Sequence, residues 1–263
     1  MRKSKMDEGK KSALCKSVLC GVCILLFPIL SGVLSAILSL GTIETLFFQS
    51  LFMLASLIIP LIFVLNGKWK WEDVGFCKYD AKCSKKAYHF LPLSAVFIPV
   101  AMKGLYFKSL SYVVGSLFLY LTVGIAEEIY FRGVIPHYLK RAFSTKEIVL
   151  LSSVIFGIGH IAAAFTVSNY GEFFLTILNA FLFGWLAIEM KIISKNITPV
   201  ILLHFFFDFE TKIVDMNENM LLIAEYVRGT IVFFAAIWLA AVIQKNKVDI
   251  QRKSQDKIGG RIA

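Results

Sequence analysis

Five ionisable side chains lie inside apolar stretches of the chain, where a charged group is costly. Glu127 and Glu128 are adjacent near the end of one stretch. His160 lies in a second stretch, and His204 and Asp208 share a third. Within a bilayer an ionisable residue usually faces the interior of a helix bundle and serves a function there. These five residues are therefore the first candidates for a site.

Helical spacing separates the roles of these residues, because residues four apart lie on one face of a helix. Glu128 and Arg132 have this spacing, which predicts an ion pair between them. Glu127 is rotated from Glu128 by about 100°, so we expect it to be the freer carboxylate. His204 and Asp208 are also four apart, and a carboxylate beside an imidazole fixes the tautomer and orientation of the ring.

The turn between the first two stretches sets the depth of their polar residues. Residues 144–147 read Ser-Thr-Lys-Glu, a capping box that predicts a helix start and a turn near residues 141–145. Glu127 and His160 are almost equally far from this turn, so antiparallel helices bring them to one depth. The stretch with His204 starts on the same side. We expect one pocket, close to that side of the bundle and open toward it.

These residue types together suit hydrolysis. A buried glutamate can act as a general base that takes a proton from water, while imidazoles orient the water and stabilise the oxyanion. Four of the residues could instead hold a zinc ion whose bound water is the nucleophile, namely Glu127, His160, His204 and Asp208. The residues alone leave both mechanisms open. The alternative without chemistry is a set of polar contacts that only holds helices together.

Composition places these residues in a membrane. Hydrophobic residues make up 57% of the 263 residues and charged residues only 17%, whereas soluble domains carry about 25% charged residues. The apolar residues form blocks, which predicts an all-α polytopic membrane bundle of about eight spans at roughly 20 residues each. The blocks are Ala13–Leu40, Ile43–Leu65, Phe90–Met102, Leu110–Ile135, Ile148–Val167, Phe173–Met190, Ile197–Phe209 and Leu221–Ile243.

The net charge of +10 follows the same arrangement. Lys and Arg residues gather in the connections on one side of the bundle, which predicts that this side and both termini are cytoplasmic. Because the charge is confined to these connections, we expect no nucleic-acid partner. The excess of lysine over arginine is typical of an AT-rich bacterial genome, so we expect a multi-pass protein of the bacterial plasma membrane.

The chain divides into three regions. They are N-terminal membrane helices with a basic cytoplasmic loop (1–109), a helical core with all five candidates (110–210), and a last span with a basic tail (211–263). Outside the five, Glu225 and Arg228 near the outer end of the last span predict a snorkelling pair. Asn179 predicts a hydrogen bond between helices, and Glu189 lies at the inner interface.

Three short patterns within the core resemble the motifs of one protein family. They are Glu-Glu-x-x-x-Arg at 127–132, Phe-x-x-x-His at 156–160 and His-x-x-x-Asp at 204–208. In order and spacing they resemble the CAAX-protease and bacteriocin-processing family, also called the abortive-infection (Abi) family. The resemblance covers residues 110–210 and implies an intramembrane endopeptidase.

The resemblance also implies a role for each motif residue. Glu127 would activate water, with Glu128 as its partner. His160 would assist at the water, while His204 and Asp208 would stabilise the oxyanion or position a ligand. Asp208 departs from the eukaryotic prenyl-protein members, which have Asn at this position, and an Asp donates a hydrogen bond only when it is protonated.

The expected substrate is a hydrophobic, lipidated or membrane-associated peptide, processed for peptide maturation or bacteriocin self-immunity. The resemblance does not decide between a glutamate-dependent enzyme and a zinc metalloprotease. Two other classes stay open. One is a non-enzymatic immunity or scaffolding protein, and the other is a proton-coupled transporter, which also uses buried Glu and His.

Overall fold

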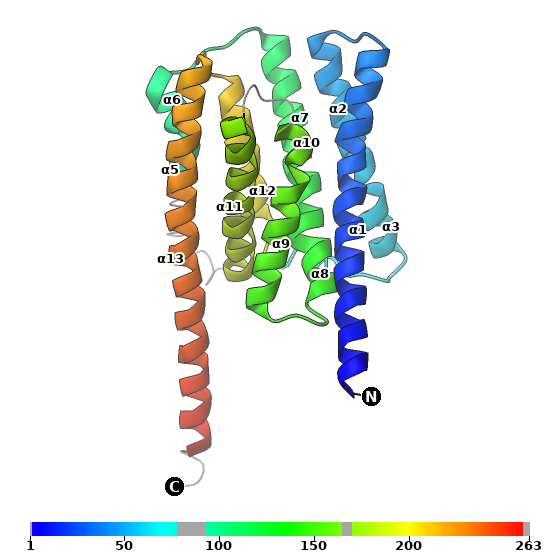
Figure 1. Cartoon of the computed structure of the whole chain (residues 1–263), viewed down its shortest axis with the longest axis vertical. Coiled ribbons are helices and arrows are strands. Elements are labelled where there is room, and N and C mark those ends of the chain that lie inside the picture. The colour runs from blue at the N-terminus through cyan, green and yellow to red at the C-terminus, as the bar shows by residue number, and fades with distance from the viewer. Residues whose placement is uncertain (1, 78–92, 165–169, 260–263) are drawn as a thin grey trace.

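The computed structural model describes residues 2–77, 93–164 and 170–259, and all regular secondary structure within these ranges is helical. The elements, drawn in Figure 1, are α1 (Arg2–Ile37), α2 (Thr42–Ser56), α3 (Ile58–Leu65), α5 (Leu93–Val96), α6 (Ile98–Lys103), α7 (Leu110–Glu128), the π-helix η2 (Ile129–Val134), α8 (Ile135–Leu139), α9 (Thr145–Gly159), α10 (Ile161–Ala164), α11 (Tyr170–Ser194), α12 (Thr198–Phe209), the 3-10 helix η3 (Glu210–Lys212) and α13 (Glu218–Gly259). The all-α prediction is confirmed for the described part of the chain.

Five of these helical stretches are long and apolar enough to cross a membrane. They are Asp7–Ile37, Thr42–Leu65, Leu110–Leu139, Tyr170–Ser194 and Glu218–Lys245. The other three predicted blocks are helical where they are described, but their helices are shorter, and residues 90–92 and 165–167 lie outside the described residues. The chain is thus a multi-pass membrane bundle, while the count of eight crossings stays a prediction.

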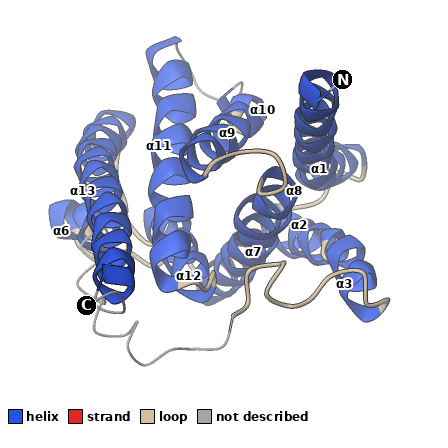
Figure 2. Cartoon of the chain, turned by 90° about the horizontal axis from the view of Figure 1, so that it is seen from below, coloured by secondary structure: helices blue, strands red, loops and turns tan. Residues whose placement is uncertain are grey.

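In Figure 1 α1, α9 and α12 run upward and α2, α7, α11 and α13 run downward, so α1 begins and α13 ends at one end of the bundle. We call this the terminal end and the opposite one the far end. Seen along the bundle from the terminal end, α11 lies between α9 and α13, and α7 lies between α2 and α12 (Figure 2). Whether the terminal end faces the cytoplasm stays a prediction based on its lysines and arginines.

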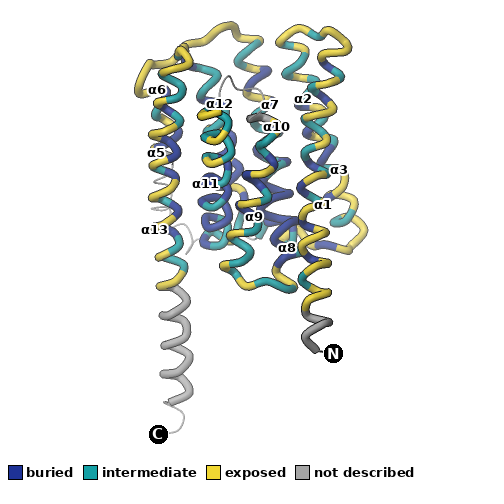
Figure 3. The backbone as a smooth tube through the Cα atoms, viewed as in Figure 1, coloured by how far each residue is buried: buried dark blue, intermediate teal, exposed yellow. Residues whose placement is uncertain are grey.

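Burial follows the same arrangement (Figure 3). Buried positions concentrate in the middle of the bundle, on α7, η2, α8, α11 and α12. The peripheral helices α1, α2 and α13 instead expose large apolar side chains, among them Leu19, Leu51 and Phe234. Such faces are suited to contact with lipid, in which an exposed Leu or Phe carries no cost.

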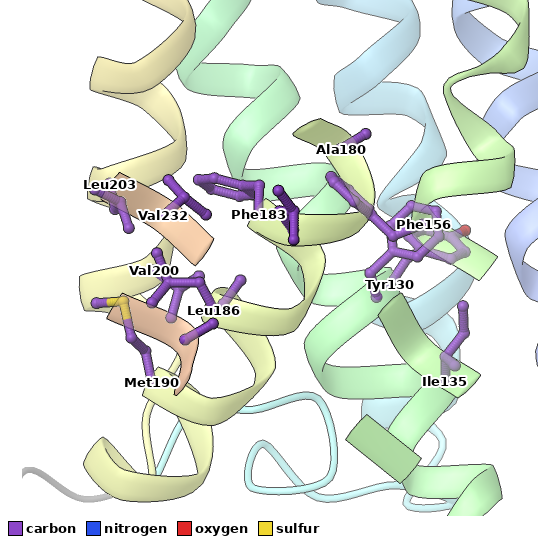
Figure 4. Packing of buried hydrophobic residues seen from close by; sticks show 14 of the residues in the cluster. Tyr130, Ile135, Phe156, Ala180, Phe183, Leu186, Met190, Val200, Leu203 and Val232 are labelled. Carbon is purple, nitrogen blue, oxygen red and sulfur yellow. The ribbon is translucent and has the colours of Figure 1, made fainter. Parts of the chain in front are cut away.

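The core packs α9 closely against α11. A Cβ atom at Gly157 would lie 3.2 Å from Cα of Phe181, and one at Gly184 would lie 3.2 Å from Cα of Ser153. The two glycines therefore allow the helix backbones to approach each other. Figure 4 shows the result, with Phe156 and Phe183 packed in one apolar layer beside Ala180.

The π-helix η2 has an identifiable cause. The N–H of Ile135 donates to the carbonyl of Tyr130, five residues earlier. The next residue is Pro136, which has no N–H to donate to Phe131. Ser152 of α9 takes this place and donates its hydroxyl to the Phe131 carbonyl at 2.8 Å. Single π-turns inside α-helices occur frequently at functional sites, and this one directly follows Glu128.

Candidate active site

Close contact between α7 and α12 brings the polar candidates together. A Cβ atom at Gly124 of α7 would lie 3.3 Å from the carbonyl oxygen of Ile201 and 3.4 Å from the nitrogen of Phe205. The absence of a side chain at Gly124 therefore lets the α12 backbone lie directly against α7. Glu128, one turn further along α7, then reaches His204 of α12.

Glu128 is held by two partners. Its Oε2 lies 3.0 Å from Nε of Arg132, which confirms the ion pair that the spacing predicted. Its Oε1 lies 2.7 Å from Nδ1 of His204. All three side chains are buried, and since a carboxylate only accepts hydrogen bonds, His204 donates from Nδ1.

Sequence spacing assigned the orientation of His204 to Asp208, and the structure changes this assignment. The carboxylate that fixes the Nδ1 tautomer is Glu128, which is 76 positions away in the chain. Asp208 lies on the other side of the ring, with Oδ2 3.4 Å from Nε2. His204 is therefore placed between carboxylates from two helices.

Glu127 is the carboxylate without a close partner. Its Oε2 lies 3.9 Å from Nε2 of His204 and is buried without a hydrogen bond to any described residue. The nearest imidazole is that of His204, and His160 lines the same cavity as His204. The expectation that Glu127 is freer than Glu128 is confirmed.

His160 lies where α9 ends. Its Nδ1 is 2.9 Å from the carbonyl oxygen of Phe156, so Nδ1–H donates to the backbone and Nε2 is left for other contacts. The ring centroid lies 4.5 Å from that of Phe156. Phe156 thus orients His160 with both its backbone and its side chain.

Arg132 is fully buried among aromatic rings. Its guanidinium carbon lies 4.1 Å from the ring centroid of Phe156 and 5.7 Å from that of Phe183. An arginine over an aromatic face gains cation–π attraction, and the gain is largest where water is excluded. Phe156 therefore contacts two members of the site, Arg132 and His160.

A cavity of about 540 Å³ extends from these residues. His160, His204 and Asp208 line its inner part, and Glu172 and Glu218 line it where α11 and α13 begin. Because both helices begin at the far end of the bundle, the cavity extends toward that end (Figure 1). The predicted opening toward the terminal end is therefore wrong.

A second buried arginine, Arg228, lines the same cavity; its predicted pairing with Glu225 is confirmed, whereas the predicted snorkelling is wrong. Arg228 of α13 is 1% exposed, so it does not snorkel. It donates to Glu225 and to the carbonyl oxygen of Phe207, and it lies 3.7 Å from Glu210. Asn179 of α11 donates a hydrogen bond to Glu225 of α13 at 3.1 Å, which confirms the predicted hydrogen bond between helices. The rule applied to the five candidates, an ionisable residue in an apolar span, would have identified Arg228.

The side-chain donors of the site are His160, His204, Asp208 and Glu127. Within the described residues, no group of three or more His, Cys, Asp or Glu side chains is arranged to hold a metal ion. Glu128 and Arg132 occupy one side of His204 with an ion pair. The four donors that the sequence suggested for zinc are therefore not gathered as a metal site in the described part of the chain, and dependence on zinc stays a prediction.

Comparison with known proteins agrees with the three motifs. Residues 109–209 match the model of a protease family, described as type II CAAX prenyl endopeptidase Rce1-like. This match confirms the resemblance to the CAAX-protease family over the segment that contains the candidate site. It supports a peptidase and gives no support to the scaffolding or transporter classes. No curated protein and no solved structure matches the chain.

Proposed function

We propose that the protein is an intramembrane endopeptidase that uses Glu127 to activate water. The observation that carries the proposal is the contrast between two adjacent carboxylates. Glu128 is held by Arg132 at 3.0 Å and by His204 at 2.7 Å, whereas Oε2 of Glu127 lies 3.9 Å from Nε2 of His204 and has no hydrogen bond to a described residue. A general base needs such a free oxygen within reach of water.

In the proposed reaction Glu127 accepts a proton from water while the water oxygen forms a bond to the carbonyl carbon of the substrate. The carbonyl π electrons move to its oxygen, which becomes an oxyanion. His204, when protonated, donates from Nε2 to this oxyanion, and Nε2 of His160 orients the water. Glu127 then gives the proton to the departing amine as the C–N bond breaks.

Asp208 has a positioning role in this scheme. Its carboxylate lies 3.4 Å from Nε2 of His204 and can accept a hydrogen bond from it before substrate binds. With Nδ1 held by Glu128, the ring cannot rotate away, so Nε2 stays directed at the reacting carbonyl. The expectation that Asp208 itself stabilises the oxyanion is not needed.

The proposed substrate is a hydrophobic or lipidated peptide that enters the cavity from the membrane. Apolar side chains form much of the cavity wall, including Leu175, Phe183, Phe207 and Leu221. Such a wall suits a lipid-modified or apolar segment, and the matched family is described as a prenyl endopeptidase. In a bacterial plasma membrane, peptide maturation or bacteriocin self-immunity would supply the physiological setting.

The test is peptide-bond cleavage by protein purified in detergent, with apolar and farnesylated peptides that carry a fluorophore and a quencher. We expect Glu127→Gln to lower kcat by about 100-fold or more, since general-base catalysis contributes about 10²–10⁴. Glu44→Gln is the matched control, because Glu44 is exposed in the first turn of α2. Full activity of Glu127→Gln would remove the proposal.

A further inference from the structure

A second cavity, of about 320 Å³, lies between α9, α11 and α13 and shares no lining residue with the first. It lies toward the terminal end, where α9 begins and α11 approaches its end (Figure 1). Its walls are largely apolar and include Val149, Leu150, Phe181, Ala240 and Ile243. A chain of methylene groups would fit against such walls.

One carboxylate lines this apolar cavity. Glu189 is 3% exposed, and its Oε1 accepts a hydrogen bond from Nε1 of Trp185 at 2.9 Å. Its Oε2 is buried and has no hydrogen-bond partner among the described residues. A buried carboxylate oxygen without a donor is costly, because its lost hydration is not replaced. A ligand that donates a hydrogen bond to Oε2 of Glu189 would therefore be stabilised in this cavity.

The edge of the cavity carries the opposite charge. Lys146, in the first turn of α9, lines the cavity and is exposed, and it forms no ion pair within the described part of the chain. Thr145 and Gln244 add polar groups at the same end. The cavity thus combines an apolar interior with a carboxyl group and a cation, at the end of the bundle where membrane headgroups lie if the helices span.

We propose that this cavity binds a zwitterionic phospholipid with a primary ammonium group, such as phosphatidylethanolamine. The ammonium would donate to Oε2 of Glu189, the phosphate would lie near Lys146, and an acyl chain would fill the apolar part. A phosphatidylcholine headgroup has the same charges but no N–H donor. Phosphatidylglycerol has a phosphate but no ammonium group. Phosphatidylcholine and phosphatidylglycerol therefore each lack the ammonium N–H that would bind Glu189.

The first experiment uses the wild-type protein and a series of lipids with identical acyl chains. Detergent-purified protein is mixed with phosphatidylethanolamine, its mono- and dimethylated forms, phosphatidylcholine or phosphatidylglycerol, and retained lipid is counted by native mass spectrometry. We expect the mono- and dimethylated lipids, which keep an N–H, to be retained like phosphatidylethanolamine, and phosphatidylcholine to be retained about tenfold less, as for loss of a charge-assisted hydrogen bond. Equal retention of phosphatidylethanolamine and phosphatidylcholine, or stronger retention of phosphatidylglycerol, would overturn the proposal.

Variants then assign the headgroup contacts. Glu189→Gln should abolish the preference for phosphatidylethanolamine over phosphatidylcholine. Lys146→Gln should weaken both lipids equally, since both carry a phosphate, whereas exposed Lys245→Gln is the matched control and should change neither. An unchanged preference in Glu189→Gln would remove the proposed contact. Because lipid retention is measured without catalysis, the result is independent of the proposed protease activity.

Discussion

Two buried arginines hold α12, and they do so through different parts of the helix. Arg132 is paired with Glu128, which holds the side chain of His204. Arg228 instead contacts the backbone of α12, at the carbonyl oxygen of Phe207. The first arrangement fixes one imidazole, whereas the second fixes the end of the helix that carries it. An Arg–Glu pair therefore orients the His204 side chain in one region and holds the end of α12 in the other.

The difference has a physical basis in helix ends. The last carbonyls of a helix lack partners within it, and Phe207 is close to the end of α12. Arg228 supplies a donor to one of them and also lies 3.7 Å from Glu210, just beyond the helix. Arg132 lies in the middle of a continuous helical stretch, and within the described residues its ion pair is with the side chain of Glu128.

The largest effect is expected from Arg132→Met. This change leaves Glu128 buried without a cation, which costs about 3–5 kcal/mol, and it should also abolish peptide cleavage. Unfolding in mixed micelles and cleavage of the fluorogenic peptide give the two measurements. The double variant Glu128→Leu/Arg132→Met should regain part of the stability but no activity, because His204 has lost its partner. Equal stability of the double and the single variant would show that the pairing is wrong.

Arg228→Met should have a smaller effect. Methionine keeps contact with the Phe207 ring, but the hydrogen bonds to Phe207 and Glu225 are lost, at a cost of about 1–3 kcal/mol. We expect reduced but measurable cleavage, because the Glu128–His204 contact is unchanged. A loss of activity as complete as in Arg132→Met, at unchanged stability, would place Arg228 in substrate binding instead.

Asp208→Asn separates the two hydrolytic mechanisms. In the proposed metal-free mechanism an Asn still accepts a hydrogen bond from Nε2 of His204, so activity should stay within about tenfold of wild type. Exhaustive chelation should then have no effect. Stoichiometric zinc in the purified protein, with activity lost on chelation and restored by zinc, would require the metal mechanism.

An ion pair near the surface gives the smallest expected effect. Asp73 lies 2.9 Å from Nδ1 of His137 and 3.0 Å from Nζ of Lys140. Partial burial acts to raise the pKa of Asp73, but hydrogen bonds from the Lys70 N–H and Lys140 outweigh it and lower the pKa to about 2. This stabilisation is complete above the unfolded pKa of about 3.9 and is lost as pH falls toward 2.

We therefore expect Asp73→Asn to lower the free energy of unfolding at pH 7 by less than about 1 kcal/mol. The difference from wild type should shrink between pH 4 and about pH 2. Unfolding measured at several pH values checks this. A difference that grows on acidification would contradict the assignment of the low pKa.

Local features of the site were predictable from the sequence. The i,i+4 spacing gave the Glu128–Arg132 pair, and the capping box at Ser144 is present with both of its hydrogen bonds. Periodicity and hydropathy also predicted where helices lie. All of these depend on residues within one or two turns of each other, for which helical geometry is sufficient.

Contacts between distant segments could not be predicted in the same way. The partner of His204 Nδ1 depends on how closely α12 approaches α7 at Gly124, and spacing within one helix says nothing about this approach. The direction of the cavity depends on how the far ends of α11 and α13 pack. Arg228 was missed because its short distance from the end of the span favoured snorkelling.

The π-helix at Ile129–Val134 directly follows Glu128, so the number of residues in this turn affects how the site is positioned. It contains one residue more than an α-helical turn would use to cover the same interval. Deleting one residue there would allow the turn to close as an ordinary α-helix. Everything before the deletion would then keep its rotation relative to everything after it, because the turn holds one residue more than an α-helix needs. A deletion between Gly124 and Glu127 has no such extra residue to remove, and it would rotate the two glutamates by about 100° away from the face on which Gly124 meets α12.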